Sequence, residues 1–256
     1  MKTKNLLLKL SKKFPKRLAK EQHDFIGLMA GKLPEEVNKI LLCLDFDEEV
    51  LPKAIEYKPD LILTHHPFIY GHRSKVLKRD PLKKELVEKV ESLGLCVYSM
   101  HTNFDIGRGG MNDALANALE LQDIQIIPEE IMMRGGKLQQ EMSAEEFAKY
   151  ANKKLNVSYS VLINAGKPAV KSVAIVGGAG SGKYYAAQNA GYDIYISGDI
   201  PHHVRRDIIA HKYNYLDMPH EIEKIFIPAM KKIINEMDPT IDILMVDHEK
   251  EGKVIC

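Results

Sequence analysis

Short apolar runs alternate with amphipathic helical patterns over the first half of the chain. The segments are, in order, KILLCLDF, EEVLPKAIEY, LILTHHPF, PLKKELVEKVESL, LCVYSMH and MNDALANALEL. Short apolar runs are typical of buried strands, whereas the segments between them have the apolar spacing of helices. This β-α-β-α-β-α order constrains the fold strongly, because it predicts an α/β lobe whose strands pair in parallel.

A second, similar rhythm follows a less regular stretch between about residues 125 and 170. Its strand-like runs are VKSVAIVGG, YDIYISGD and IDILMVDH. In the less regular stretch, Gly135-Gly136 is typical of a turn, and Ser143 with Glu146 has the pattern of a capping box that opens a helix. The sequence therefore predicts an α/β fold with two similar lobes on mixed sheets, an N-terminal lobe of residues 1–125 and a C-terminal lobe of residues 126–256.

Composition narrows the class of protein. The chain has 256 residues, is 45% hydrophobic and carries a formal net charge of +1, so no global field favours nucleic acid or an anionic membrane. No apolar run approaches the roughly 20 residues of a membrane span, and no signal-peptide pattern opens the chain. Cys43, Cys96 and Cys256 lack C-x-x-C spacing and are interpreted as packing residues in a reducing compartment. We expect a cytoplasmic protein.

Two adjacent histidines, His65 and His66, end the apolar run LILTHHPF. A buried strand has no structural need for two imidazoles at its tip, so metal binding is the simplest explanation. Neighbouring residues of an extended chain point to opposite sides, so the pair could serve two metal ions, or one ion and one supporting contact. Asp45 and His101 also follow strand-like runs, and ligands of doubly wound sheets gather at such strand ends.

Two further pairs combine an imidazole with a carboxylate. A helical turn or a tight loop would bring His101 and Asp105 to one ion. His220 and Glu223 lie in the first turn of an expected helix, hence on one face, and Pro228 predicts a kink or break further along that helix. Taken singly, each residue has an ordinary explanation, such as a hydrogen-bonded histidine, an Asx turn or a helix-dipole contact. Periodicity alone does not bring these segments together.

A glycine-rich segment in the second half satisfies most of the phosphate-loop pattern G-x-x-x-x-G-K-[ST]. It runs GGAGSGK from Gly177 to Lys183, after an expected strand and before an expected helix. Position 184 is Tyr, so the hydroxyl that would bind Mg²⁺ is missing. We interpret the segment as a glycine turn rather than a nucleotide loop, although its backbone N–H groups could contact a substrate phosphate.

Five blocks, in order and spacing, resemble the Nif-three-like family, whose members are often labelled GTP cyclohydrolase type-two homologues. The blocks are FPKRLAKEQHDFIGLMAG, ILLCLDFDEEVLPKAIEYKPDLILTHHPFIY, HTNFDIGRGGMNDALANALEL, VAIVGGAGSGKYYAAQNAGYDIYISGDIPHH and DMPHEIEKIFI. The resemblance covers nearly the whole chain. It implies a metal site in the cleft between the two lobes and a ring-shaped homohexamer.

The resemblance also implies roles for single residues. It predicts a pair of divalent metal ions per chain, bound by His65, His66, Asp105, His220 and Glu223. It predicts catalytic roles for two further histidines: His101, which either ligates metal or relays protons, and His203, which faces the same cavity. Nitrogen and carboxylate ligands suit zinc, manganese, iron, cobalt or nickel.

A dinuclear site predicts hydrolysis, because bound metal lowers the pKa of water toward neutrality. By resemblance, the metal hydroxide would attack a nucleotide such as GTP or a related substrate. The alternative is a metal-stabilised ring that binds nucleic acid or protein without catalysis, using the Lys-rich segments 9–20 and 75–84 and Arg205-Arg206. The near-zero net charge counts against nucleic acid.

Overall fold

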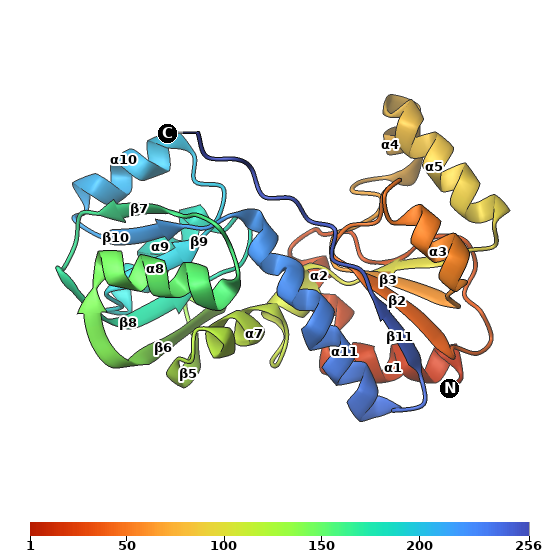
Figure 1. Ribbon diagram of the computed structural model, residues 1–256, viewed down its shortest axis with the longest axis horizontal. Helices are drawn as coiled ribbons and strands as arrows, with labels where there is room; N and C mark the ends of the chain where they lie inside the picture. Colours follow the sequence, from red (N-terminus) through yellow and green to blue (C-terminus); the bar gives the residue numbers. More distant parts are fainter. Residues whose placement is uncertain (256) are drawn as a thin grey trace. The chain divides into compact units, whose positions relative to one another are not determined.

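The computed structural model describes residues 1–255, which form two compact units (Figure 1). The first unit comprises Met1–Gly110 and Phe226–Glu249, and the second comprises Met111–Ile225 and the residues from Lys250 onward. These units differ from the contiguous division at residue 125 expected from the sequence, because Phe226–Glu249 returns to the first unit. The compact units group residues that contact one another and do not test where a domain begins or ends. The domain boundary expected at residue 125 therefore stays a prediction.

A five-stranded mixed sheet forms the centre of the first unit, in the order β1-β4-β3-β2-β11. Its strands are β1 (Gly27–Ala30), β2 (Lys39–Cys43), β3 (Leu61–Thr64), β4 (Val97–Ser99) and β11 (Asp242–Met245). The last four are parallel, whereas β1 is antiparallel to β4. Every residue of β3 is buried, as expected of a parallel strand covered on both faces.

The α-helices of the first unit are α1 (Thr3–Lys13), α2 (Lys16–Glu21), α3 (Leu51–Tyr57), α4 (Arg73–Arg79), α5 (Pro81–Ser92), α6 (Thr102–Ile106) and α11 (Phe226–Met237). Among them, α5 and α11 pack directly on strands of this sheet, and α4 packs on α5. Helix α3 connects β2 to β3, and α4 and α5 connect β3 to β4 (Figure 1). These crossovers are what the alternating pattern of the sequence predicts for parallel strands.

The second unit contains a six-stranded mixed sheet in the order β5-β6-β8-β9-β10-β7. Its strands are β5 (Gln122–Ile127), β6 (Glu130–Ser143), β7 (Val161–Asn164), β8 (Ala169–Ile175), β9 (Ile194–Ser197) and β10 (Asn214–Asp217). Its α-helices are α7 (Met111–Ala118), α8 (Ala144–Leu155), α9 (Tyr184–Asn189) and α10 (His202–Ala210). Strands β8, β9 and β10 are parallel, so the predicted α/β class with mixed sheets is confirmed in both units.

The turn predicted at Gly135-Gly136 is wrong. Both glycines lie inside β6, which pairs with β5 and β8. A Cβ atom at Gly135 would lie 2.1 Å from the Tyr192 hydroxyl, and one at Gly136 would lie 2.9 Å from Leu121 Cβ. These glycines therefore allow close packing on a strand, a role that local sequence does not distinguish from a turn.

Helix ends in the second half follow the local sequence more closely. The capping box is present: the Ser143 hydroxyl accepts from the Glu146 N–H, and the Glu146 carboxylate accepts from the Ser143 N–H. The expected long helix after His220 is broken into a 3₁₀ segment, η2 (His220–Ile225), and α11. Pro228 therefore lies in the first turn of α11, where its missing N–H costs little.

Each unit has its own hydrophobic core. In the first unit, Leu41, Cys43 and Ile62 of the sheet pack with residues of α3 and α5. Cys43 and Cys96 are buried free thiols, and Cys256 lies outside the described residues. Among the described helices, none combines the length and apolar character that crossing a bilayer requires.

Candidate metal-binding residues

The parallel strands of the first unit place polar residues at one edge of the sheet. Cys43 pairs with Thr64 in register, and Thr64 pairs with Ser99, so β2, β3 and β4 end at the same level. Each strand continues into a candidate residue: Asp45 after β2, His65 after β3 and His101 after β4. The structure thus brings these three strand ends to one edge of the sheet, as the sequence predicts, because carboxyl ends of neighbouring parallel strands lie together.

Three imidazoles meet at this edge. Nitrogen atoms of His65, His66 and His101 all lie within 4.8 Å of one another, a spacing that would allow a shared cation. Asp105, from α6, adds a carboxylate: its Oδ1 lies 3.4 Å from His65 Nε2. His65 and Asp105 are buried, whereas His66 and His101 are partly exposed.

The Nδ1 atom of each of these histidines is already engaged. His65 Nδ1 lies 2.9 Å from the Met100 carbonyl, so this nitrogen donates its proton and the neutral ring keeps a lone pair on Nε2. His66 Nδ1 lies 2.6 Å from Asp45 Oδ2, and His101 Nδ1 lies 2.8 Å from Asp24 Oδ2. A carboxylate or carbonyl behind the ring is the usual support of a metal-binding histidine, because it fixes the tautomer that presents Nε2.

The second unit carries its own imidazole and carboxylate pair. His220 and Glu223 belong to η2, where side chains three residues apart align along the helix. His220 Nε2 lies 3.1 Å from Glu223 Oε2, and His220 Nδ1 lies 2.5 Å from Asp199 Oδ2. His220 therefore resembles His66 and His101, because an aspartate lies behind its Nδ1 atom. Its Nε2 atom lies beside the carboxylate of Glu223, the other candidate ligand of this unit.

The pKa of His220 is raised to about 9 by these neighbours, first through the hydrogen bond to Glu223 and against the opposing effect of burial. A metal ion would therefore compete with a proton for Nε2. Glu223 itself is buried, with 4% of its surface exposed.

The glycine-rich segment packs directly on this pair. Gly178 has a φ of +62°, and a Cβ atom there would lie 2.4 Å from Glu223 Oε1 and 3.1 Å from His220 Nε2. Lys183, the lysine of the phosphate-loop pattern, forms an ion pair with Glu130 at 2.5 Å. The backbone of this segment thus packs against the His220 and Glu223 side chains and leaves no room for a side chain at Gly178.

Sequence reasoning did not assign the supporting aspartates. Asp45 could be noticed because it follows a strand, but Asp24 lies in the loop before β1 and carries no such signal. Burial opposes ionisation of Asp24, yet hydrogen bonds from His101 and Thr102 lower its pKa to about 2. Asp24 is therefore an anion whenever the protein is folded near neutral pH.

His203 is the one predicted residue outside both sets. It lies in the first turn of α10 with an exposed side chain. Its catalytic role stays a prediction, as does that of His101.

Two α/β units whose strand ends carry imidazole and carboxylate donors define an α/β protein with groups that could hold divalent metal ions. The family model for Duf34/NIF3 (NGG1p interacting factor 3) matches residues 1–252. The chain belongs to this family, which confirms the resemblance seen in the sequence blocks.

Relatives agree with this placement. The chain is 29% identical over 240 residues to a Clostridium perfringens protein named GTP cyclohydrolase 1 type 2 homolog, covering 91% of each chain. It is 30% identical over 251 residues to a Lactococcus lactis protein of the same name, covering 95% of each. Among solved structures, a Bacillus cereus protein related to NIF3 shares the fold with a TM-score of 0.89 at 22% identity, over 100% of this chain and 99% of that chain.

Proposed function

We propose that this protein is a divalent-metal-dependent hydrolase that binds two metal ions per chain. The ligands in this proposal are His65, His66 and Asp105 in the first unit and His220 and Glu223 in the second. Their oxygen and nitrogen donors suit zinc, manganese, iron, cobalt or nickel better than magnesium, which prefers oxygen.

The observation that carries the proposal is the hydrogen-bonding of the Nδ1 atoms of the four imidazoles. Every Nδ1 faces an acceptor: Met100 O behind His65, Asp45 behind His66, Asp24 behind His101 and Asp199 behind His220. Histidines that serve only packing or surface solvation do not need this common orientation. Metal-binding histidines do, because a hydrogen bond to Nδ1 makes Nε2 a better and better-aligned ligand.

When bound, divalent metal ions supply Lewis-acid polarisation and lower the pKa of water toward neutrality, which is the chemistry of hydrolases. In the protein itself, Asp24 holds the Nδ1 proton of His101 and leaves Nε2 to accept or return a proton. We assign the proton-transfer role to His101 and, from the exposed start of α10, to His203.

For the substrate, we propose a nucleotide or a related compound whose hydrolysis resembles that of GTP. The support is the name that the Clostridium perfringens and Lactococcus lactis relatives carry. We further propose a homo-oligomer, a hexameric ring, in line with the resemblance of the five sequence blocks. We also propose that it acts in the cytoplasm.

Hydrolysis of a nucleotide panel by the metal-loaded protein tests this function. We expect metal-dependent turnover that falls more than about a hundredfold in His65→Ala and in Glu223→Ala, because each loses a ligand. His72→Ala is the matched control, since His72 is exposed and belongs to neither ligand set. Turnover unaffected by both ligand variants would refute the proposal, and bound metal without any turnover would favour the non-catalytic binding module.

A further inference from the structure

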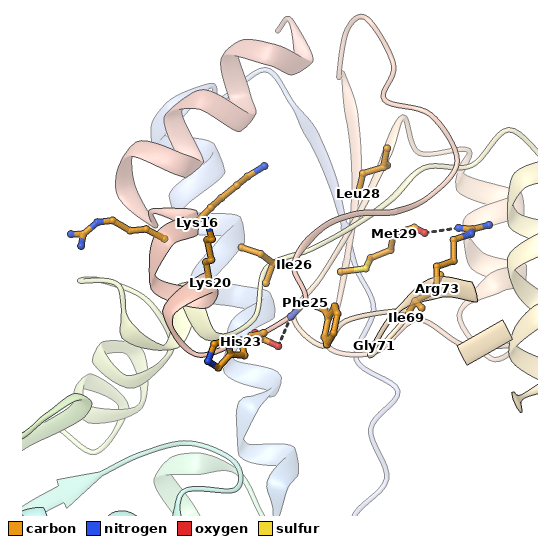
Figure 2. Close-up of a pocket in the computed structure, with 12 residues that line it drawn as sticks. Lys16, Lys20, His23, Phe25, Ile26, Leu28, Met29, Ile69, Gly71 and Arg73 are labelled. Atoms are coloured by element: carbon orange, nitrogen blue, oxygen red, sulfur yellow. Dashed lines mark hydrogen bonds between the residues drawn. The ribbon is translucent and has the colours of Figure 1, made fainter. Parts of the chain in front are cut away.

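A pocket of about 720 Å³ opens on the first unit beside α2 (Figure 2). Of its lining residues, only Asp24 has a role in the function proposed above, as the acceptor behind His101. We propose that it binds a small organic anion with an apolar, ring-sized body, such as an aryl phosphate or carboxylate. Its volume falls in the range of about 300–1,000 Å³ that is common for small-molecule sites.

Positive charge comes from α2. Lys16 and Lys20 are four residues apart, hence on one face of the helix, and both line the pocket. Among the described residues neither lysine forms an ion pair with a carboxylate, while the Lys16 Nζ atom lies 5.5 Å above the Tyr98 ring. Two ammonium groups without carboxylate partners would be complemented by an anion.

The other cations at the rim contribute less. Arg73 donates to Glu91 at 2.9 Å and to the Met29 carbonyl at 2.9 Å, which neutralises and fixes its guanidinium. Arg17 lies 3.7 Å from Glu21. Figure 2 shows Lys16 and Lys20 on one side of the pocket and Arg73 on the other. The anionic group is therefore expected at the lysine side.

Apolar side chains line the space between these two sides. Phe25 and Met29 lie centrally in Figure 2, with Ile26 toward α2 and Ile69 toward Arg73. Leu28, on β1, also lines the pocket, although 46% of its surface is exposed. A lining that combines apolar walls with charge at one side is typical of sites for amphipathic small molecules and not of sites for bare inorganic ions.

Asp24 connects the pocket to the histidine set. It lines the pocket, its Oδ1 accepts from the Phe25 N–H at 2.8 Å, and its Oδ2 accepts from His101 Nδ1 at 2.8 Å. The negative charge of Asp24 is thus directed at His101 and the backbone. The Asp24 side chain would therefore lie between a ligand in the pocket and His101. That this ligand is the substrate of the metal centre rests on the function proposed above, whereas anion binding by the pocket does not.

Naphthalene-1-sulfonate is a suitable probe for the full-length, metal-loaded protein, because it has the ring and the charge but is a poor metal ligand. Its affinity is measured by fluorescence titration and compared with that of uncharged 1-naphthalenemethanol. We expect saturable sulfonate binding that weakens about threefold to tenfold in the double variant Lys16→Gln/Lys20→Gln, the size expected for two exposed charge contacts. The uncharged alcohol is expected to bind both proteins alike.

The matched control is Lys149→Gln/Lys153→Gln, which removes two exposed lysines at the same spacing from α8. We expect this variant to bind both probes as the wild type does. Leu28→Thr, which keeps a strand-forming residue, is expected to weaken both probes. Equal sulfonate affinity in the two lysine variants, or no saturable binding, would overturn the pocket proposal. Metal content is measured in parallel, so failure of the pocket is distinguishable from failure of the proposed hydrolase.

Discussion

At the scale of single residues, the aspartates behind the imidazoles are the least expected feature of the chain. Asp24, Asp45 and Asp199 come from three separate loops, yet each accepts a hydrogen bond from the Nδ1 atom of a candidate histidine. A carboxylate in this position fixes ring orientation and raises ligand basicity. If the histidines bind metal as proposed, these aspartates would tune metal affinity without contacting the metal.

Asp45→Asn tests this role. The amide can no longer accept as an anion from His66 Nδ1, so we expect metal affinity to fall about tenfold to a hundredfold with the fold retained. Competition with a chromophoric chelator measures the change. Asp47→Asn is the control, because Asp47 lies on the same loop but pairs with His248. Equal affinities of the two variants would show that Asp45 does not support His66.

Gly178 is a residue-scale requirement of a different kind. Any side chain there combines a strained φ of +62° with a contact of 2.4 Å to Glu223 Oε1. We expect Gly178→Ala to lower the free energy of unfolding by about 1–3 kcal/mol and to reduce metal content. Urea denaturation and elemental analysis measure the two effects. Gly182→Ala, in the same segment, is the control: its Cβ atom meets no atom within 4 Å, so stability and metal content should stay unchanged. A Gly178→Ala variant with wild-type stability and metal content would contradict the supporting role of this segment.

At the scale of elements, the sequence predicts most where the signal is local. Strand ends at Asp45, His65 and His101 follow from the alternation of apolar runs, and the capping box at Ser143 follows from two residues. The turn predicted at Gly135-Gly136 is wrong, because the reason for glycine there lies in contacts with residues elsewhere in the chain: Tyr192 beside Gly135 and Leu121 beside Gly136. Local patterns do not contain such long-range contacts.

Asp193 links two elements of the second sheet and gives a pH-dependent prediction. It precedes β9 and accepts from the Lys167 ammonium at 2.6 Å and from the Ser172 N–H, on β8, at 2.9 Å. Burial favours the neutral carboxyl, but these bonds outweigh it and lower the pKa of Asp193. A lowered pKa in the folded state stabilises the protein above the unfolded pKa of about 3.9, and this stability is lost as pH falls through the folded pKa.

We therefore expect Asp193→Asn to be less stable than the wild type by about 1 kcal/mol at pH 7. The difference should shrink as pH falls below about 4, because the wild-type carboxyl becomes protonated. Urea denaturation at pH 7 and at pH 3 measures it. A deficit of the same size at both pH values would mean that the carboxylate charge is not the cause.

At the scale of the whole molecule, the return of the chain to the first unit could not be predicted. The run IDILMVDH has the pattern of a strand, but nothing in it specifies the sheet that it joins; the structure pairs β11 with β2. Pairing between distant segments depends on the complete fold. The family resemblance, by contrast, covers nearly the whole chain and predicts ligand sets that periodicity alone does not bring together.

Removal of metal should affect the stability of the whole molecule. A ligand that binds only the folded state stabilises it by about 2.7 kcal/mol at a free concentration of one hundred times Kd. We therefore expect chelator treatment to lower the unfolding temperature and added Zn²⁺ or Mn²⁺ to restore it, as followed by calorimetry. An unfolding temperature that responds to neither treatment would argue against metal binding to the folded protein.

The central claim, that the chain holds a pair of divalent metal ions, is tested most directly by elemental analysis. The protein is purified without chelator and without a metal-binding affinity tag, and metal atoms per chain are measured for the wild type and Glu223→Ala. We predict about two per chain in the wild type and fewer in the variant. A folded wild-type protein that contains no metal would contradict the account.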